Sequence, residues 1–517
     1  MANRSRTEYS IINMAASLGG YALNILLSFV CRIVFVHHLN AEYLGINGLF
    51  SNILSMLSLA ELGVGTAMIY ALYRPVAEDD QKKTASYMKV YSTAYKVIGV
   101  VIAVLGLLLI PFLDLLIKNS PNISENITVL YLIFLFSTVS SYFYSYRSSI
   151  LIAHQENYIV LAISYGVVIV QNLAQILALV LLKDYMVYLI LQVVFVLVTN
   201  ILISAAAKKR YPYIADKNAE KLSKTEIRSL AKNIKALTVT KLSGILVNNT
   251  DSIVITYFNG LITTGVVSNY SLITNTIASF ANQVFTSLSA SLGNLNAVGD
   301  DEHKYHVFKA LNLANFWLYG WAAIGIVCLS NDVITLFFGG TYVMGLKIPI
   351  ILAVNFYMLG MQCVVGLYKS TMGLFRYGQY ILLFTAALNL IGDILLGQLW
   401  GVFGIFLATA LARAFTNTWY EPFVIFKHGF HLNFASYIAR YLLYAGLLVV
   451  TCGLCYTMCQ LIKFSLVPRI IVKCLICIIV PNAVFILSFS KTGEVHYLLG
   501  AASMLKNKVI TRLRHRA

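Results

Sequence analysis

The sequence predicts an all-α polytopic membrane protein with about 14 transmembrane helices, arranged as two six-helix lobes followed by a pair of helices. Of its 517 residues, 59% are hydrophobic and only 11% are charged, and the mean hydropathy is +0.76. Soluble domains carry about 25% charged residues, so this composition excludes a water-soluble globular protein. Apolar stretches of about 20 residues, each long enough to cross a bilayer, recur from one end of the chain to the other.

Each of these stretches is predicted to form a helix. The predicted helices span 13–36, 43–73, 92–117, 129–152, 158–182, 185–206, 236–258, 262–292, 307–330, 346–372, 379–399, 401–426, 437–462 and 467–489. The first segment is too long for a signal peptide and has no small-residue cleavage pattern, so we interpret it as a retained helix.

The domain organisation follows from the longest hydrophilic stretch, 207–235, which is basic and central. We interpret it as a cytoplasmic linker between an N-terminal lobe, 1–206, and a C-terminal lobe, 236–427. Beyond these lobes we expect an appended helix pair, 428–490, and a basic cytoplasmic tail, 491–517.

The charge distribution tests this topology. The net charge is +17, which in a soluble protein would indicate nucleic acid as a partner, but in a membrane protein basic residues mark cytoplasmic loops. With the N-terminus placed inside, 30 of the 38 Lys and Arg residues fall on the inner side and six on the outer side. The other two, Arg32 and Arg413, lie within helices. We therefore expect a multi-pass membrane protein with both termini in the cytoplasm.

The cysteines indicate neither disulfides nor a metal site. Cys452, Cys455, Cys474 and Cys477 have the spacing of a zinc ribbon. All four lie in apolar runs without turn residues, so we interpret them as small hydrophobic packing residues.

A weak internal repeat relates the two lobes. Shifting the chain by 220 residues aligns Asn13 with Asn233, Ile33 with Ile253, Val34 with Val254, Gly45 with Gly265, Phe50 with Tyr270 and Ser51 with Ser271. Both aligned windows begin a six-helix set after a basic segment. Transporters commonly contain such repeats, with the substrate path between them.

Four predicted helices carry a polar face. Successive residues of a helix are about 100° apart, which places each set on one face. The sets are, for 13–36, Asn13, Ser17, Gly20, Asn24, Ser28 and Arg32; for 43–73, Asn47, Gly48, Ser51, Ser55, Ser58, Glu61 and Gly65; for 236–258, Lys241, Gly244, Asn248 and Asp251; and for 262–292, Ser268, Ser271, Asn275, Ser279, Asn282, Thr286 and Ser289. Small and weakly polar residues let helix backbones approach, which is one explanation of these faces. The other is the wall of a hydrophilic cavity, because polar groups in lipid face the protein interior or water.

The ionisable residues deep in the predicted helices are few, namely Arg32, Glu61, Asp251, Asp393 and Arg413. Each costs roughly 2.5–3.5 kcal/mol at the bilayer centre on insertion scales, so a retained charge is usually paired or functional. Arg32 aligns beside Asp251 under the repeat shift. It could form a structural ion pair between the lobes, or bind an anionic substrate group with Asp251 or Glu61 as its resting partner, since guanidinium donates bidentate bonds to phosphate.

Several motifs resemble a known family. They are Glu42-Tyr-Leu-Gly-Ile-Asn-Gly-Leu-Phe, Leu59-Ala-Glu-Leu-Gly-Val-Gly-Thr-Ala, Tyr146-Arg-Ser-Ser-Ile-Leu-Ile-Ala-His-Gln-Glu-Asn-Tyr158, Asn249-Thr-Asp-Ser-Ile-Val-Ile and Gly265-Val-Val-Ser-Asn-Tyr270. Over essentially the whole chain, the sequence resembles the bacterial Wzx-like polysaccharide flippases of the MATE/MOP transporter superfamily, which implies a location in the bacterial inner (plasma) membrane. The resemblance implies two lobes that rock about a central cavity. It also implies transport of an undecaprenyl-pyrophosphate-linked oligosaccharide from the inner to the outer leaflet by alternating access, for cell-surface polysaccharide biosynthesis.

The polar faces and this resemblance together define the expected substrate site. The predicted substrate-binding residues are Arg32, Glu61, Asp251, Asn47, Ser55, Asn248, Asn275, Asn282, Arg147, Lys241 and Arg413. No catalytic residue, metal or cofactor is expected. The expected partners are the lipid-linked oligosaccharide, membrane lipids and a coupling ion, H⁺ or Na⁺.

Two other functions compete with a flippase. A MATE-type ion-coupled multidrug antiporter would favour an acidic cavity, which Glu61, Asp251 and Asp393 allow but Arg32 and Arg413 oppose. A membrane enzyme such as a polysaccharide polymerase would need a long outer loop, and every predicted outer loop is short. The sequence also lacks a P-loop, so energy is expected from an ion gradient or the membrane potential rather than from ATP.

Overall fold

The computed structural model describes residues 6–500 with short gaps. The gaps are 62–63, 114–116, 118–122, 155, 216–218, 287, 289–291, 293–294, 297–299, 375–376 and 379, and within helices the side chains of 6–19, 21–22, 59–60, 66, 229, 232–233, 235–237 and 239–249 are not described. The chain divides into two compact units, Met1–Ser268 and Asn269–Ala517. All regular structure within the described residues is helical.

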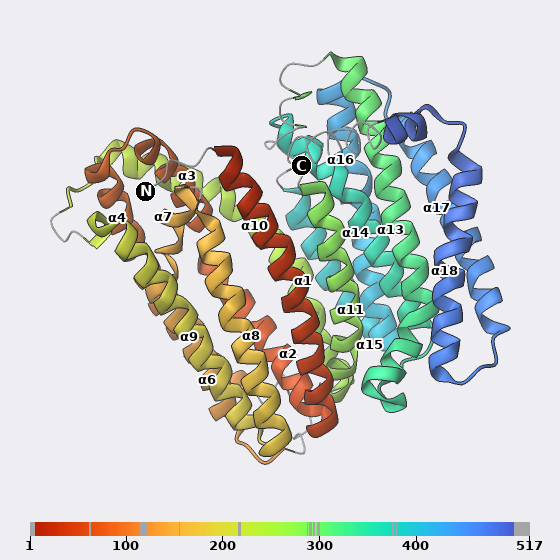
Figure 1. The fold of residues 1–517 in the computed structure, drawn as a ribbon, viewed down its shortest axis with the longest axis horizontal. Coiled ribbons are helices and arrows are strands. Elements are labelled where there is room, and N and C mark those ends of the chain that lie inside the picture. Colours follow the sequence, from red (N-terminus) through yellow and green to blue (C-terminus); the bar gives the residue numbers. More distant parts are fainter. Residues whose placement is uncertain are drawn as a thin grey trace, which may run out of the picture. The chain divides into compact units, whose positions relative to one another are not determined.

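The first unit contains the helices of the N-terminal half (Figure 1). They are α1 (Arg6–His38), α2 (Ala41–Leu57), η1 (Ser58–Glu61), α3 (Val64–Ala77), α4 (Gln81–Leu108), η2 (Ile110–Phe112), α6 (Ile127–Ser145), α7 (Ser148–Ala153), α8 (Asn157–Leu181), α9 (Tyr185–Arg210), η3 (Pro212–Ala215), α10 (Lys224–Asn259) and the beginning of α11 (Leu261–Thr286). Helix α1 packs along α8, and α9 packs between α8 and α6.

The second unit contains the rest of α11 and the helices that follow it along the chain (Figure 1). They are α13 (Asp301–Phe338), η4 (Gly340–Tyr342), α14 (Lys347–Thr371), α15 (Ile381–Phe415), α16 (Asn417–Ile425), η5 (Phe426–Phe430), α17 (Ala435–Gln460) and α18 (Leu466–Phe489). Helix α13 contacts α14, α17 and α18, and its buried aromatic residues, such as Phe316 stacked on Tyr444, form the centre of the core.

Every predicted transmembrane segment overlaps a helix of the structure. Nine helices in the described part of the chain are long and apolar enough to cross a membrane. This confirms the all-α polytopic fold class, while the count of about 14 crossings stays a prediction. The lobe boundaries predicted from the sequence likewise stay predictions.

The second predicted helix, 43–73, is not continuous. It ends at Leu57, tightens into the 3₁₀ turn Ser58–Glu61 and resumes at Val64. The Ser58 hydroxyl donates to the Leu54 carbonyl oxygen at 2.9 Å, a local bond that competes with the helical pattern and bends helices. The interruption brings Glu61 to the junction between two helical segments.

Helix α10 begins earlier than predicted, within the hydrophilic stretch 207–235. Ser223 caps its first turn, and the Glu226 side chain accepts in return from the Ser223 backbone N–H, which completes a capping box. The pattern Ser-x-x-Glu in the sequence was the available signal for this helix start.

The two aligned glycines of the repeat, Gly45 and Gly265, occupy equivalent places in a reciprocal contact. A Cβ added at Gly45 would lie 2.2 Å from the Leu261 carbonyl oxygen, and one added at Gly265 would lie 2.4 Å from the Ala41 carbonyl oxygen. Leu261 and Ala41 are themselves related by the 220-residue shift. The starts of α2 and α11 therefore approach each other at positions where only glycine fits. Two copies of one motif related by a two-fold axis would make such a contact.

Candidate functional site

Arg32, near the end of α1, contacts the start of α11. Its Nη2 donates a hydrogen bond to the Ser268 hydroxyl, which itself donates to the Gly265 carbonyl oxygen at 2.6 Å. The structure therefore joins two of the polar faces that the sequence defined, because Arg32 belongs to the first and Ser268 to the last. The arginine is only partly buried.

Gly20, Asn24 and Ser28 of the α1 polar face take part in helix contacts, whereas the side chains of Asn13 and Ser17 lie outside the described residues. A Cβ at Gly20 would collide with the Tyr165 ring of α8, and the Asn172 amide of α8 donates to the Ser28 hydroxyl at 3.5 Å. Ser28 in turn donates to Asn24. For these residues the contacts favour the packing explanation.

Glu61 lies in a cluster of tyrosines at the interruption between α2 and α3. The Tyr95 hydroxyl donates to Glu61 Oε1, and Tyr91 donates to Tyr95 at 3.3 Å. Gly65 makes room for this cluster, because a Cβ there would lie 2.9 Å from the Tyr95 hydroxyl. Among the described residues Glu61 forms no ion pair, so the predicted resting pair with Arg32 is not formed in this conformation.

The polar face of α2 is open. Asn47 and Ser55 are half-buried, Ser51 is exposed, and no described atom lies within 4 Å of a Cβ built at Gly48. On α11, Asn275 and Asn282 are also exposed, and Asn282 accepts a hydrogen bond from Tyr319 at 2.9 Å. The assignment of these faces to the wall of a water-filled cavity stays a prediction.

The predicted residues of α10 are described only in part. Asp251 is half-buried, whereas the side chains of Lys241 and Asn248 lie outside the described residues.

Arg147 contributes to structure at the junction of α6 and α7. Its guanidinium lies 5.2 Å from the Tyr146 ring centroid, donates to the Tyr146 hydroxyl at 3.0 Å and also donates to Ser204 of α9. These contacts are with none of the other predicted site residues.

A polar pocket of about 800 Å³ lies where α3 ends and α4 and α10 begin. Its lining includes Tyr70, Tyr73, Arg74, Lys83, Tyr87 and Glu226. The hydrogen bond from Lys83 lowers the pKa of Glu226 to about 2, so this carboxyl group stays ionised at neutral pH. Aromatic faces and charged groups of both signs thus surround one space, which periodicity along single helices did not reveal.

The second unit holds a fully buried polar cluster within α15. The backbone of Gly401, with φ of 58°, turns the chain so that two helical segments fold against each other. The Asn389 amide donates to Asp393 Oδ1 at 2.9 Å and to the Thr409 hydroxyl at 3.1 Å. Arg413 is also buried, one turn beyond Thr409. Asp393 and Arg413 are recognisable in the sequence as ionisable residues deep in predicted helices, whereas Asn389 and Thr409 were not predicted to belong to a site.

The chemistry of this cluster suits a small hard cation or a proton. Carboxylate, amide and hydroxyl oxygens are the ligands that hard cations prefer. The Asn389 carbonyl oxygen is buried and has no hydrogen-bond donor among the described residues, so it is available as a ligand. The signal in the sequence was an Asn-x-x-x-Asp pair within an otherwise apolar helix.

The fold is similar to that of solved membrane transporters and flippases, one of which is a MATE family transporter of the MOP superfamily. A lipid II flippase, MurJ, in an inward closed conformation, is similar over 93% of this chain and 99% of its own, with a TM-score of 0.66 and 15% identity. A Vibrio cholerae MATE transporter, VcmN, covers 83% of this chain and 99% of its own, with a TM-score of 0.54 and 13% identity. An inward-facing multidrug resistance MATE transporter covers 79% and 95%, with a TM-score of 0.53 and 14% identity.

At the level of the fold, these similarities confirm the resemblance to the MATE/MOP superfamily. No family model matches the chain, and no curated protein matches it.

Proposed function

We propose that this chain is a flippase that moves an undecaprenyl-pyrophosphate-linked oligosaccharide from the inner to the outer leaflet of a bacterial cell membrane. In this proposal both termini are cytoplasmic and the two lobes alternate in access to a central cavity. The chain then supplies the lipid-linked intermediate to cell-surface polysaccharide assembly and catalyses no covalent reaction.

The observation that carries this proposal is the extent of the structural similarity. The lipid flippase matches 93% of the chain, whereas the two MATE transporters match 79% and 83%. The difference is comparable to the length of the appended helix pair, 428–490. A chain with the overall extent of a lipid flippase is more consistent with a lipid substrate than with a soluble drug.

The chemistry of Arg32 supports an anionic lipid carrier. A diphosphate presents several oxygen acceptors, and a guanidinium group can donate two parallel bonds to them. In this conformation Arg32 contacts Ser268, a neutral partner that a charged phosphate can replace. Substrate binding at Arg32 would therefore alter a contact between α1 and α11.

The pocket at the ends of α3, α4 and α10 supports a saccharide head group. Sugar rings have apolar faces that fit against tyrosine rings, while their hydroxyl groups hydrogen-bond to charged side chains. Tyr70 is 69% exposed, which is unusual for a tyrosine unless its ring meets a ligand or a membrane interface. This end of the unit is predicted to face the cytoplasm, where the glycolipid is made.

A coupling ion would bind at Asn389, Asp393 and Thr409. This buried cluster supports ion-coupled transport and is equally compatible with the second candidate function, a MATE-type multidrug antiporter. The two functions differ in the charge of the substrate: an antiporter would take a cation, and Arg32 would oppose it.

The test is reconstitution of the purified chain in proteoliposomes. A fluorescent undecaprenyl-pyrophosphate oligosaccharide is placed in the liposomes, and a membrane-impermeant lectin or reductant measures its exposure on the opposite leaflet. We expect protein-dependent exposure of the glycolipid and no uptake of ethidium. Dye transport without glycolipid exposure would instead establish the antiporter.

A further inference from the structure

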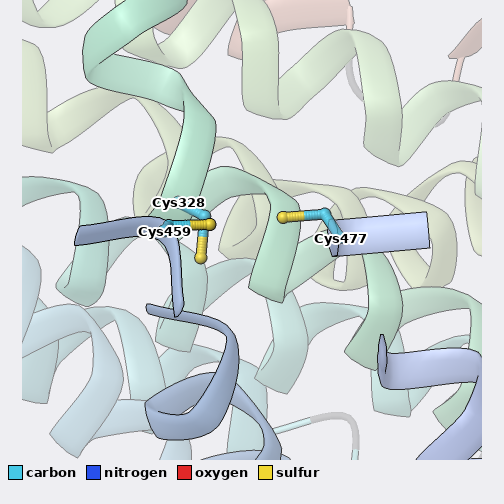
Figure 2. A group of neighbouring side chains, drawn as sticks. All are labelled: Cys328, Cys459 and Cys477. Atoms are coloured by element: carbon cyan, nitrogen blue, oxygen red, sulfur yellow. The ribbon is translucent and has the colours of Figure 1, made fainter. Parts of the chain in front are cut away.

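Three buried cysteines from three helices meet in the second unit. Cys328 lies on α13, Cys459 on the last turn of α17 and Cys477 on α18, and their Sγ atoms all lie within 4.8 Å of one another (Figure 2). Each side chain is at most 6% exposed, and all three thiols are free. In Figure 2 the Cys477 sulfur is directed toward the sulfurs of the other two residues.

This group differs from the four cysteines with zinc-ribbon spacing. Of those four, only Cys477 belongs to it, and the other two members come from elsewhere in the sequence. The packing of α13 against α17 and α18 brings the group together.

The separation of the thiols suits a single metal ion. Zinc–sulfur bonds of about 2.3 Å in tetrahedral geometry place ligand sulfurs about 3.8 Å apart. Sulfurs within 4.8 Å of one another reach that spacing with small side-chain adjustments. Thiolate ligands select soft or borderline metals such as Zn²⁺ and Cu⁺.

A second feature of the structure, an ionic layer one helical turn away, favours a divalent ion. Asp332 follows Cys328 by four residues on α13, and Lys473 precedes Cys477 by four residues on α18. Lys473 Nζ lies 2.6 Å from Asp332 Oδ2, and Arg469 Nη2 lies 2.9 Å from Asp332 Oδ1. Lys473 also interacts electrostatically with Cys459.

With a divalent ion bound, the charge of the three-thiolate site is balanced by the charge of the ionic layer. Three thiolates with Zn²⁺ carry a net charge of −1, and the ionic layer of one Asp, one Lys and one Arg carries +1. The same layer would leave a copper(I) site with excess negative charge in an apolar surrounding, where uncompensated charge is costly.

We propose that Cys328, Cys459 and Cys477 form a thiolate site for one Zn²⁺ ion. The ion ties the α17–α18 helix pair to α13, and its fourth coordination position is left to a small external ligand. The thiols lose their protons to solvent as the ion binds, so affinity falls at low pH. The ion stabilises the second unit, because it binds an arrangement of thiols that only the folded chain presents.

The test uses the full-length chain purified in detergent and stripped of metal with a chelator. Titration with Cd²⁺, a spectroscopic substitute for Zn²⁺, is followed through the thiolate-to-cadmium charge-transfer absorption. We expect saturation at one equivalent, displacement by Zn²⁺, and a rise in melting temperature on loading with Zn²⁺. Cys328→Ala, Cys459→Ala and Cys477→Ala should each weaken binding at least tenfold.

Matched controls are Cys363→Ala and Cys452→Ala, which remove other free cysteines of the same unit and should bind as the wild type does. X-ray absorption of the zinc-loaded wild type provides a measurement that does not depend on any variant, and we expect three sulfur ligands. The absence of saturable binding, or binding that survives removal of all three thiols, would overturn the proposal. A disulfide between two of the three in freshly purified protein would overturn it as well.

Discussion

Arg32 and Glu61 show how the surroundings of a charged residue bear on its role. Both were predicted to contact substrate, and each could have paired with the other. In the structure Glu61 accepts a hydrogen bond from Tyr95, whereas Arg32 donates to Ser268. Glu61 thus accepts from a neutral phenol at a helix interruption, whereas Arg32 contacts a hydroxyl group at the start of α11. The two residues are therefore expected to differ in their sensitivity to substitution.

The prediction at this scale concerns Arg32. Arg32→Lys retains the positive charge but loses the bidentate donor geometry, so transport should be impaired in part. Arg32→Ala should abolish glycolipid exposure in proteoliposomes while the protein still inserts and elutes as the wild type does. Ser268→Ala removes only the hydroxyl partner and serves as the matched control, with an expected change of less than about threefold, since one neutral hydrogen bond contributes little.

The alternative for Arg32 is a structural ion pair with Asp251. In that case removal of both partners in Arg32→Ala with Asp251→Ala avoids an unpaired buried charge and should restore transport. Recovery in this double variant would contradict the substrate-binding role. Continued inactivity at normal expression would support it.

Among the elements, the contact between the starts of α2 and α11 is tightly constrained. Glycine occupies both equivalent positions because the facing atoms are backbone carbonyl oxygens, which cannot rotate away as a side chain would. Such a contact permits two helices to cross closely and fixes the distance between them. The internal repeat thus extends from the sequence to a symmetric packing arrangement.

A methyl group at this crossing should destabilise the first unit. Gly45→Ala and Gly265→Ala are each expected to lower the free energy of unfolding by about 1–3 kcal/mol, because the added atom overpacks a backbone contact. The measurement is thermal unfolding in detergent. Gly48→Ala, on the same helix with open space around the added Cβ, is the matched control and should have little effect. Equal losses of stability in Gly45→Ala and Gly48→Ala would indicate that α2 tolerates no added methyl group. They would contradict a specific close crossing at Gly45.

At the scale of the whole molecule, the structure explains part of the residual charge on the predicted outer side. Arg469 and Lys473 are two of the six basic residues there, and both pair with the carboxylate of Asp332. Because Arg469 and Lys473 join α18 to α13, their position is explained by helix packing and not by the distribution of charge across the membrane. With them accounted for, the asymmetry of the remaining basic residues is stronger support for a cytoplasmic N-terminus.

The topology prediction can be checked in whole cells with an impermeant thiol reagent. In a variant lacking the native cysteines, Lys463→Cys should be labelled in intact cells, because the turn between α17 and α18 is predicted to be external. Glu220→Cys, in the hydrophilic stretch before α10, should be labelled only after permeabilisation. Labelling of Glu220→Cys from outside would overturn the orientation.

The sequence by itself determined the membrane class, the helical segments and the residues most expected to be functional. The free energy of transfer of an apolar segment into lipid and the attraction of a basic loop to the inner leaflet depend only on the residues of that segment or loop. Both can therefore be predicted without knowing which helices contact each other. Polar faces on single helices can be predicted for the same reason, since a helix has one period.

Only the tertiary structure decided which partner each face meets. One α1 face proved to be divided, with Ser28 packed against α8 and Arg32 bonded to the start of α11. The cluster at Asn389 depends on the turn at Gly401, and the three thiols depend on how α13, α17 and α18 pack. These arrangements join residues distant in sequence, and side-chain periodicity gives the direction of a face but carries no information on the helix that will cover it.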